Sequence, residues 1–406
     1  MNLNRTIFRW CIIPISITCL LVCNIAKTAN AQVNKEFNKP IAVFPFQSLA
    51  GGIIMVKATI DNYPDSLHLI FDTGNTGFSL DSATASNLGL KITPTDRTVR
   101  GIAGVKQAFF TYQHQVNFPG FTTDNFDFHI SDYALFEQVY GIKIDGIIGY
   151  SFFNKYVVKI NYDTRLIECY APANFAYPKR GYFLPTKLYR YPVNTAILQE
   201  EFIVSSNSIF DIGAGLNYLV SSKLINDVNL FSPGKKYFKT QVEGLGGKKL
   251  IDITVLKKMN LGKFRFRNVP VHIFDDEFDI LNYPSLGGII GSDLLRRFNM
   301  IINYAEEKIH LTPNSHFRDP FDYHYSGISF YVVDGMVTIV DIVPNSPGAL
   351  FGFKEDDVII AINGKLVTDL KFLKDNLELK RLRHELSVIR NNQFLSLPIK
   401  LINIKK

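Results

Sequence analysis

The sequence predicts a mainly β protein made of two similar lobes followed by a smaller C-terminal domain. Short apolar runs recur between Gly, Pro and Asn turns without long helical periodicity, which is the pattern of many short strands. Three sequence landmarks occur twice in the same order. After residue 325 the pattern changes to two strand-like runs and a turn rich in small residues. The 33 Phe and 19 Tyr residues also favour strands.

The first landmark is the hexapeptide L-I-F-D-T-G at 69–74, which returns as S-I-F-D-I-G at 208–213, 139 positions later. The second landmark is a glycine-rich turn. It reads G-I-A-G at 101–104 and G-L-G-G at 244–247, at an offset of 143. Both pairs keep the same order along the chain, which indicates a duplication rather than a chance likeness.

The third landmark is an apolar segment that begins G-I-I-G. Residues 145–161 and 287–303 align without gaps at an offset of 142. Two copies are too few for a solenoid, so we interpret the repeat as a duplicated domain with pseudo-two-fold symmetry. The predicted organisation is a signal peptide at 1–31, a first lobe at 40–173, a second lobe at 182–312 and a C-terminal domain at 326–402.

The N-terminus has the pattern of a secretory signal peptide. Arg5 and Arg9 precede an apolar run at 11–23, and small residues at 29–31 suit cleavage. The run is too short for a comfortable transmembrane helix. We therefore expect secretion across the inner membrane, to the periplasm or the extracellular space. Two alternatives tether the protein to the membrane: an uncleaved anchor, or a lipid attached at Cys23.

Composition narrows the classes of partner and cofactor. The net charge of +7 is scattered, without a long basic run, so we do not predict nucleic-acid binding. Beyond residue 31 the only cysteine is Cys169, which excludes an internal disulfide and is expected to be a packing residue. The eight histidines show no H-E-x-x-H or paired spacing, and C-x-x-C is absent. We therefore predict no metal and no cofactor.

The repeated aspartates are the strongest candidates for chemistry. Asp72 and Asp211 each follow an apolar run, where a carboxylate is costly unless it is paired or hydrogen-bonded. Gly74 and Gly213 let backbone N–H groups approach those carboxylates closely. If the lobes face each other, the two like charges cannot both ionise and must share one proton. One carboxylate is then a base and the other an acid, which suits attack of water on a peptide carbonyl.

These features resemble retropepsin-like and pepsin-like aspartic peptidases, specifically the two-lobed bacterial kind with a C-terminal PDZ domain. The resemblance covers about residues 40–311 and implies an aspartic-type endopeptidase acting on polypeptide substrates, with Asp72 and Asp211 as the catalytic pair. It implies that the following residues support the catalytic loops: Thr73, Gly74, Ile212 and Gly213. It implies that the following residues form flaps over substrate: Gly101, Ile102, Gly104, Gly244, Leu245, Gly246 and Gly247.

The sequence departs from this family at Ile212, where Thr or Ser is usual and hydrogen-bonds to the other lobe. Only Thr73 can make its half of that brace. One lost hydrogen bond is worth on the order of 1 kcal/mol, which loosens a site without abolishing it. A second hypothesis is therefore a weak or inactive peptide-binding protein that retains the cleft. A third is an adhesion or scaffold protein that uses the C-terminal domain alone.

The segment 346–364 resembles the PDZ pattern, although Asp356 stands where glycine is usual. PDZ domains bind an extended peptide as an added strand and often grip its terminal carboxylate with backbone N–H groups. The resemblance implies the following gripping stretch: Gly327, Ile328, Ser329 and Phe330. We expect a peptide ligand there; the alternative is a domain that only packs on the peptidase.

Overall fold

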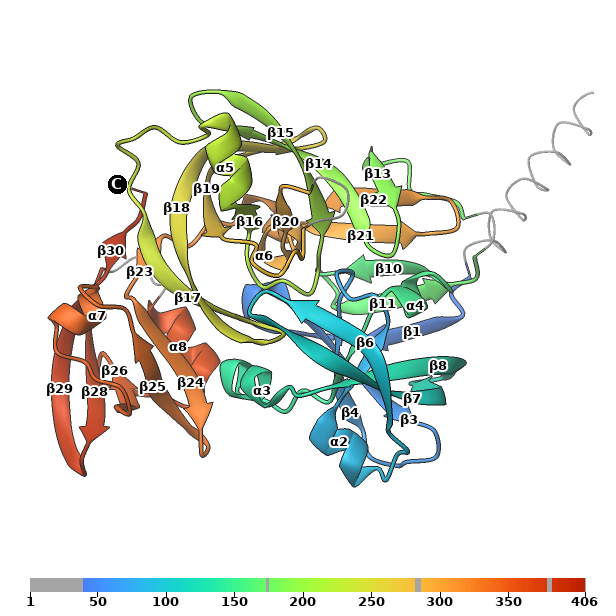
Figure 1. Ribbon diagram of the computed structural model, residues 1–406, viewed down its shortest axis with the longest axis horizontal. Helices are drawn as coiled ribbons and strands as arrows, with labels where there is room; N and C mark the ends of the chain where they lie inside the picture. Colours follow the sequence, from blue (N-terminus) through green and yellow to red (C-terminus); the bar gives the residue numbers. More distant parts are fainter. Residues whose placement is uncertain (1–38, 173–174, 282–285, 378–381, 406) are drawn as a thin grey trace, which may run out of the picture.

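The computed structural model describes residues 39–172, 175–281, 286–377 and 382–405. The predicted signal peptide and Cys23 lie outside the described residues. Strands make up 52% of the structure and helices 13%, which confirms the predicted mainly β class. Figure 1 shows two lobes that meet at a central sheet, with a separate C-terminal domain beside them.

The first lobe is a closed barrel with strand order β3-β4-β9-β5-β8-β7, in which β3 pairs back to β7. Strands β2 and β6 extend it at either end. The strands are β2 (Gln47–Ser48), β3 (Ile54–Ile60), β4 (Leu67–Phe71), β5 (Phe78–Asp81), β6 (Thr93–Gly101), β7 (Gly104–Phe118), β8 (Phe121–Ser131) and β9 (Gly146–Ile148). The helices are η1 (Ala50–Gly52), α2 (Ser82–Asn87), α3 (Ala134–Tyr140) and α4 (Tyr150–Phe153).

The second lobe repeats this topology strand for strand, with order β14-β15-β20-β16-β19-β18 and β14 pairing back to β18. Strands β13 and β17 take the places of β2 and β6. The strands are β13 (Thr186–Leu188), β14 (Pro192–Gln199), β15 (Ile203–Phe210), β16 (Tyr218–Ser221), β17 (Phe238–Gly244), β18 (Gly247–Leu261), β19 (Phe264–Phe274) and β20 (Gly288–Ile290). The helices are α5 (Ser222–Val228) and α6 (Ser292–Leu295).

Equivalent short helices begin in the same way in both lobes. The Asp81 side chain accepts a hydrogen bond from the Thr84 N–H at the start of α2, and Ser221 accepts one from Leu224 at the start of α5. Such N-caps satisfy backbone donors that the first helical turn leaves free. The three repeated landmarks fall on matching elements as well, so the predicted pseudo-symmetry is present in the topology.

A six-stranded sheet joins the lobes, in the order β1-β11-β10-β21-β22-β12. Strand β10 of the first half pairs with β21 of the second, with Val158 opposite Ile302. Cys169 is fully buried in this sheet, as expected of a packing residue. The strands are β1 (Ala42–Pro45), β10 (Val157–Asn161), β11 (Leu166–Tyr170), β12 (Tyr182–Leu184), β21 (Phe298–Asn303) and β22 (Lys308–Pro313).

The C-terminal domain has its own sheet, in the order β24-β25-β26-β28-β29, and its own apolar core around Ile339, Leu373 and Leu386. Strand β24 is at the sheet edge. The strands are β24 (Ile328–Val333), β25 (Met336–Ile342), β26 (Val358–Ile362), β27 (Lys365–Leu366), β28 (Arg383–Arg390) and β29 (Gln393–Lys400), with β23 (His324–Tyr325) paired to β30 (Ile402–Asn403) outside this sheet. The helices are α7 (Pro347–Leu350) and α8 (Leu370–Leu377).

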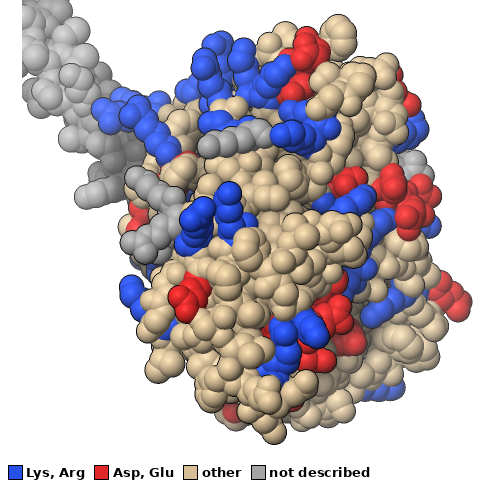
Figure 2. Space-filling model, turned by 90° about the vertical axis from the view of Figure 1, so that its left-hand side faces the viewer, with Lys and Arg blue, Asp and Glu red and all other residues tan. Residues whose placement is uncertain are grey.

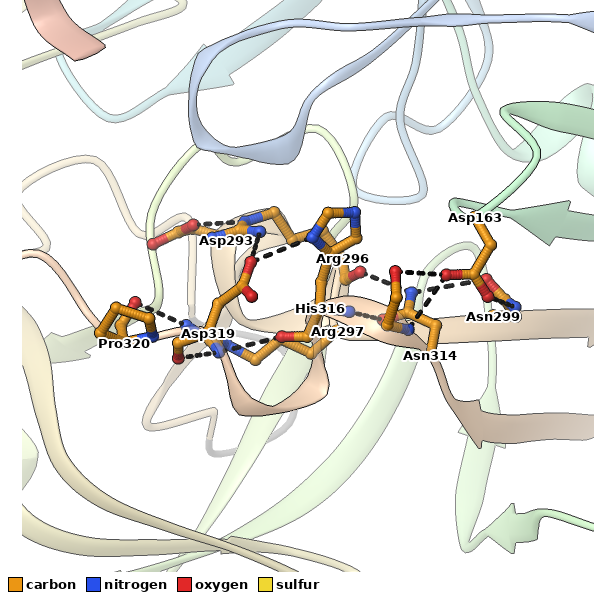
Figure 3. A network of polar contacts seen from close by, with 10 residues as sticks. Asp163, Asp293, Arg296, Arg297, Asn299, Asn314, His316, Asp319 and Pro320 are labelled. Carbon is orange, nitrogen blue, oxygen red and sulfur yellow. Dashed lines mark hydrogen bonds and ion pairs between the residues drawn. The ribbon is translucent and has the colours of Figure 1, made fainter.

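The segment that leads to this domain is held firmly against the second lobe (Figure 3). The buried Arg297 guanidinium donates to the carbonyl oxygens of His316 and Asp319, at 3.3 and 2.6 Å. Arg296 contacts the Asp319 carboxylate at 3.0 Å. The short helix η2 (Ser315–Arg318) lies within this network. The C-terminal domain is therefore joined to the lobes through an ordered, hydrogen-bonded connection.

Acidic and basic side chains are mixed on the face shown in Figure 2, where small groups of each lie between larger uncharged areas. Within the described part of the chain, no helix is long and apolar enough to cross a membrane.

Candidate active site

The structure brings Asp72 and Asp211 together between the lobes, where their side chains hydrogen-bond each other. Each also accepts a hydrogen bond within its own loop, from the N–H of Gly74 at 2.6 Å and of Gly213 at 2.7 Å. A Cβ at Gly74 would lie 2.7 Å from Cγ of Asp211, and one at Gly213 would lie 2.6 Å from Oδ2 of Asp72. Each glycine therefore makes room for the carboxylate of the opposite lobe.

The pKa values of both carboxylates are raised, and different neighbours contribute to each shift. Burial, and then the charge of Asp211, raise the pKa of Asp72 well above its usual value. Burial also raises the pKa of Asp211, but hydrogen bonds from Asp72, Gly213 and Ala214 oppose the rise. Two close carboxylates titrate as one coupled system. In its singly protonated state the pair therefore shares one proton, and the two titration steps belong to both carboxylates together.

The two G-I-I-G segments position the aspartates. Strand β9 runs parallel to β4, and its Ile148 carbonyl accepts the Asp72 N–H at 2.9 Å. Strand β20 runs parallel to β15, and its Ile290 carbonyl accepts the Asp211 N–H, also at 2.9 Å. Gly149 packs against the carbonyl of Asn75, close enough that a side chain there would overlap the loop. The G-I-I-G segments therefore support the loops that carry the two aspartates.

Thr73 crosses between the lobes, as predicted. Its hydroxyl donates to the Phe210 carbonyl at 2.6 Å and accepts the Ile212 N–H at 3.2 Å. Ile212 is fully buried in the main apolar core, so the second half of the brace is replaced by packing. The interlobe connection at the aspartates is therefore polar on one side and apolar on the other.

Replacing Thr73 with Val should lower the free energy of unfolding by about 2–3 kcal/mol. The substitution keeps the shape, but it removes two buried hydrogen bonds worth about 1 kcal/mol each and leaves the Phe210 carbonyl unpaired. Urea denaturation of both proteins measures the difference. Thr73→Ser, which retains the hydroxyl, should lose less than half as much; equal losses for Ser and Val would show that the hydroxyl contributes nothing.

The two glycine-rich turns are the tips of long hairpins, and the tips touch each other. Figure 1 shows β17 extending from the second lobe toward β6 of the first. The Ala103 N–H donates to the Leu245 carbonyl at 3.4 Å. A Cβ at Gly101 would lie 2.6 Å from the carbonyl carbon of Leu245, and one at Gly246 would lie 2.8 Å from Cα of Gly104. The structure therefore has two flap-like hairpins that meet, here called flap 1 (β6–β7) and flap 2 (β17–β18).

Each tip packs on the opposite lobe. Ile102 of flap 1 contacts an apolar cluster of the second lobe, and Leu245 of flap 2 contacts one of the first lobe. The buried members of the second-lobe cluster are Val193, Ile209, Leu219, Ile251, Phe274, Leu281, Leu286 and Ile289. Those of the first-lobe cluster are Ile53, Met55, Ile70, Tyr133 and Ile144. The crossed packing holds both flaps in a closed position.

These two clusters were not predicted as parts of the site, although the sequence at the start of β3 indicates one of them. Ile54 and Val56 point into the barrel core, whereas Ile53 and Met55 point to the cluster under flap 2. A strand with one wet face alternates apolar and polar residues, whereas residues 53–56 at the start of β3 read I-I-M-V, and alternation begins only at Lys57. A continuous apolar run beside a flap hairpin therefore marks a second buried face.

In the C-terminal domain the predicted gripping stretch begins β24. Gly327 has φ +68°, and its carbonyl accepts the Val343 N–H. The Ile328 N–H donates to the Ser326 hydroxyl at 3.1 Å, and Phe330 is buried in the domain core. Ser329 lies opposite Asp341 in β25. One backbone donor of the stretch is thus already used within the domain.

A duplicated β-barrel with two loop aspartates in contact defines the class of the aspartic peptidases. Comparison with known families agrees: residues 56–152 match the family described as aspartyl protease, and residues 325–401 match the PDZ domain. The chain thus carries an aspartyl protease domain and a C-terminal PDZ domain. No curated protein matches the chain. Over the described ranges, no group of three or more His, Cys, Asp or Glu could hold a metal ion.

Proposed function

We propose that the protein is an aspartic-type endopeptidase that hydrolyses peptide bonds with Asp72, Asp211 and a water molecule. The observation that carries the proposal is the contact between two buried carboxylates from opposite lobes, each lying against the glycine of the other loop. In this proposal Thr73, Gly213 and their partners support the catalytic loops, and the flap tips cover the substrate.

The proposed reaction begins with Asp72 protonated and Asp211 ionised. Asp211 takes a proton from water as the water attacks the peptide carbonyl, and Asp72 gives its proton to the carbonyl oxygen. The tetrahedral diol then collapses: Asp211 protonates the leaving nitrogen while Asp72 removes a proton from a diol hydroxyl. The C–N bond breaks, an acid and an amine are released, and the pair returns to its starting protonation state.

The proposal includes export and peptide binding. The N-terminal pattern supports a signal peptide at 1–31, and we propose lobe limits of 40–173 and 182–312 and a PDZ domain at 326–402. The expected partners are polypeptides: substrates at the aspartates and a peptide ligand on β24. The edge position of β24 supports the second, because an edge strand has backbone groups available for an added strand.

Cleavage of a denatured protein should follow a bell-shaped pH profile. Activity requires one shared proton, so it falls when pH rises through the raised pKa of Asp72, where both carboxylates ionise. It also falls when pH drops through the lower pKa of the pair, where both are protonated. Purified protein is incubated at several pH values and the fragments are identified by mass spectrometry. Absence of cleavage from mildly acidic to neutral pH would overturn the proposal.

Ile212 favours a second candidate, a peptide-binding protein with little or no catalysis. The substitution Ile212→Thr separates the two functions. An active enzyme should keep its kcat/KM within about fivefold, because Thr73 already crosses the interface and the added hydroxyl is worth about 1 kcal/mol. A protein inactivated by Ile212 would instead gain activity from near zero. Initial rates on one peptide substrate, measured for both proteins, decide between them.

A further inference from the structure

The PDZ domain contacts flap 2 directly, through the buried Tyr331 of its edge strand β24. The Tyr331 hydroxyl donates to the Glu243 carboxylate at 2.6 Å and accepts a hydrogen bond from the Gln241 side chain at 2.7 Å. The Lys248 ammonium lies 4.5 Å from the centre of the Tyr331 ring. These three partners flank the flap tip on both of its strands, and Tyr331 is only 2% exposed. The contact is therefore a closely packed, charge-assisted one.

A second contact follows the same hairpin toward its base. The Tyr325 hydroxyl donates to the Lys239 carbonyl at 2.7 Å, and the Tyr325 ring packs against that of Phe238 with centroids 5.2 Å apart. Val255 of the flap and Ile404, which follows the PDZ domain, complete this buried cluster. Strand β17 is thus held near its start by β23, which leads into the PDZ domain, and beside its tip by β24 of that domain.

Helix α3 of the first lobe completes the contact on the other side of β24. Figure 1 shows α3 between β24 and the first lobe, and α3 packs on both β24 and β17. Gly141, which ends α3 with φ +70°, lies so near Val332 that a Cβ there would be 2.9 Å from Cγ2 of Val332. The same position is 3.9 Å from Cβ of Leu370, at the start of α8. Helix α3 therefore lies where β24 and α8 approach each other.

A cavity of about 650 Å³ lies between the first lobe and the PDZ domain, next to this contact. Its walls include Leu49, Tyr140 and Ile142 from the first lobe, and Val332, Val367 and Leu370 from the PDZ domain. The three first-lobe residues also pack on the apolar cluster under the tip of flap 2. The cavity beside β24 and the cluster beneath flap 2 thus share a wall made of these three residues.

We propose that the PDZ domain is a latch on the peptidase. In the closed state β24 holds flap 2 down and α3 covers the region between β24 and α8. An extended polypeptide with a free C-terminus that binds along β24 displaces α3, separates Tyr331 from Glu243 and releases the flap. The inference rests on the proposed function, because it names the regulation of that same site. A ligand shifts such an equilibrium only by binding the open state more tightly than the closed one.

A disulfide between α3 and β24 tests the latch in the full chain. An ideal Cβ at Gly141 lies 3.8 Å from Cβ of Val332, which is the usual separation in a disulfide. In the double variant Gly141→Cys, Val332→Cys, oxidation should lower the cleavage rate at least roughly tenfold and slow amide hydrogen exchange in residues 238–247. Reduction should restore both. Gly141→Cys alone has the same backbone strain and should respond to neither treatment.

The substitution Tyr331→Phe tests the latch in the opposite direction. It removes the hydroxyl that contacts Gln241 and Glu243 but keeps the ring. Hydrogen exchange at the tip of flap 2 should become about five- to tenfold faster, as expected from a lost charge-assisted hydrogen bond. Exchange in β26 and β28, within the PDZ core, should not change.

The cleavage rate and the hydrogen-exchange rate together distinguish failure of the latch from failure of the proposed function. If oxidised and reduced double variants cleave equally fast and exchange equally, the latch is wrong. If exchange follows the disulfide while neither form cleaves any peptide, the latch stands and the proposed hydrolysis fails.

Discussion

Asp211→Asn is expected to lower kcat/KM for a peptide substrate about 10³-fold or more. The substitution is isosteric, but the amide cannot take a proton from water, and Asp72 alone cannot be both acid and base. The Asn side chain also removes the charge that helps to hold the pKa of Asp72 high. Initial rates over a range of pH measure the loss at the optimum of each protein.

Asp356→Asn is the matched control. It removes the same charge at an exposed turn of the PDZ domain with φ +66°, a backbone conformation that Asn tolerates well. Its kcat/KM should equal that of the wild type. An Asp211→Asn protein that is folded, as judged by an unchanged melting temperature, and retains more than about a tenth of the activity would contradict the assigned role of the pair.

Gly74→Ala is expected to lower kcat/KM about 100-fold or more without adding or removing a charge. Its new Cβ would lie 2.7 Å from Cγ of Asp211, so the carboxylate must move away. A displacement of about 1 Å at reacting groups costs on the order of 10² in rate. Steady-state kinetics, together with the pH profile, should show both a lower rate and a change in the coupled pKa values.

Gly77→Ala gives the comparison within the same loop. The nearest atom to a Cβ there is the Ser151 hydroxyl oxygen at 3.7 Å, an ordinary contact, so activity should be retained. Equal activity of the two alanine variants would mean that Asp211 does not need the space beside Gly74. A loss confined to Gly74→Ala ties the effect to the opposite carboxylate.

The parts of the fold that are written twice could be predicted from the sequence. The repeat of the Asp72 and Asp211 hexapeptides at a nearly constant offset required two equivalent barrels, and the structure has them. The aspartates meet because each hexapeptide ends a strand at the lobe interface, held by the paired G-I-I-G strand. A single D-T-G motif would not have predicted a paired site, whereas two copies at a nearly constant offset did.

Contacts between units could not be predicted, because no repeated or periodic feature encodes them. Nothing in the sequence around Tyr331 or Glu243 indicates that the two residues contact each other, and only the structure shows their hydrogen bond. Helix α3 was missed because it is short and follows a strand without a side-chain cap. The crossed packing of Ile102 and Leu245 depends on the relative tilt of two hairpins, which local sequence does not determine.

Titration of carbon-13-labelled aspartate carboxyls by NMR tests the shared proton most directly, because it needs neither substrate nor activity. Asp72→Asn and Asp211→Asn spectra assign the two signals. The account predicts that both signals report the same two separated steps, and that removing either residue leaves a single step for the other. Two independent single-step titrations, each near the ordinary value of about 3.9, would contradict it.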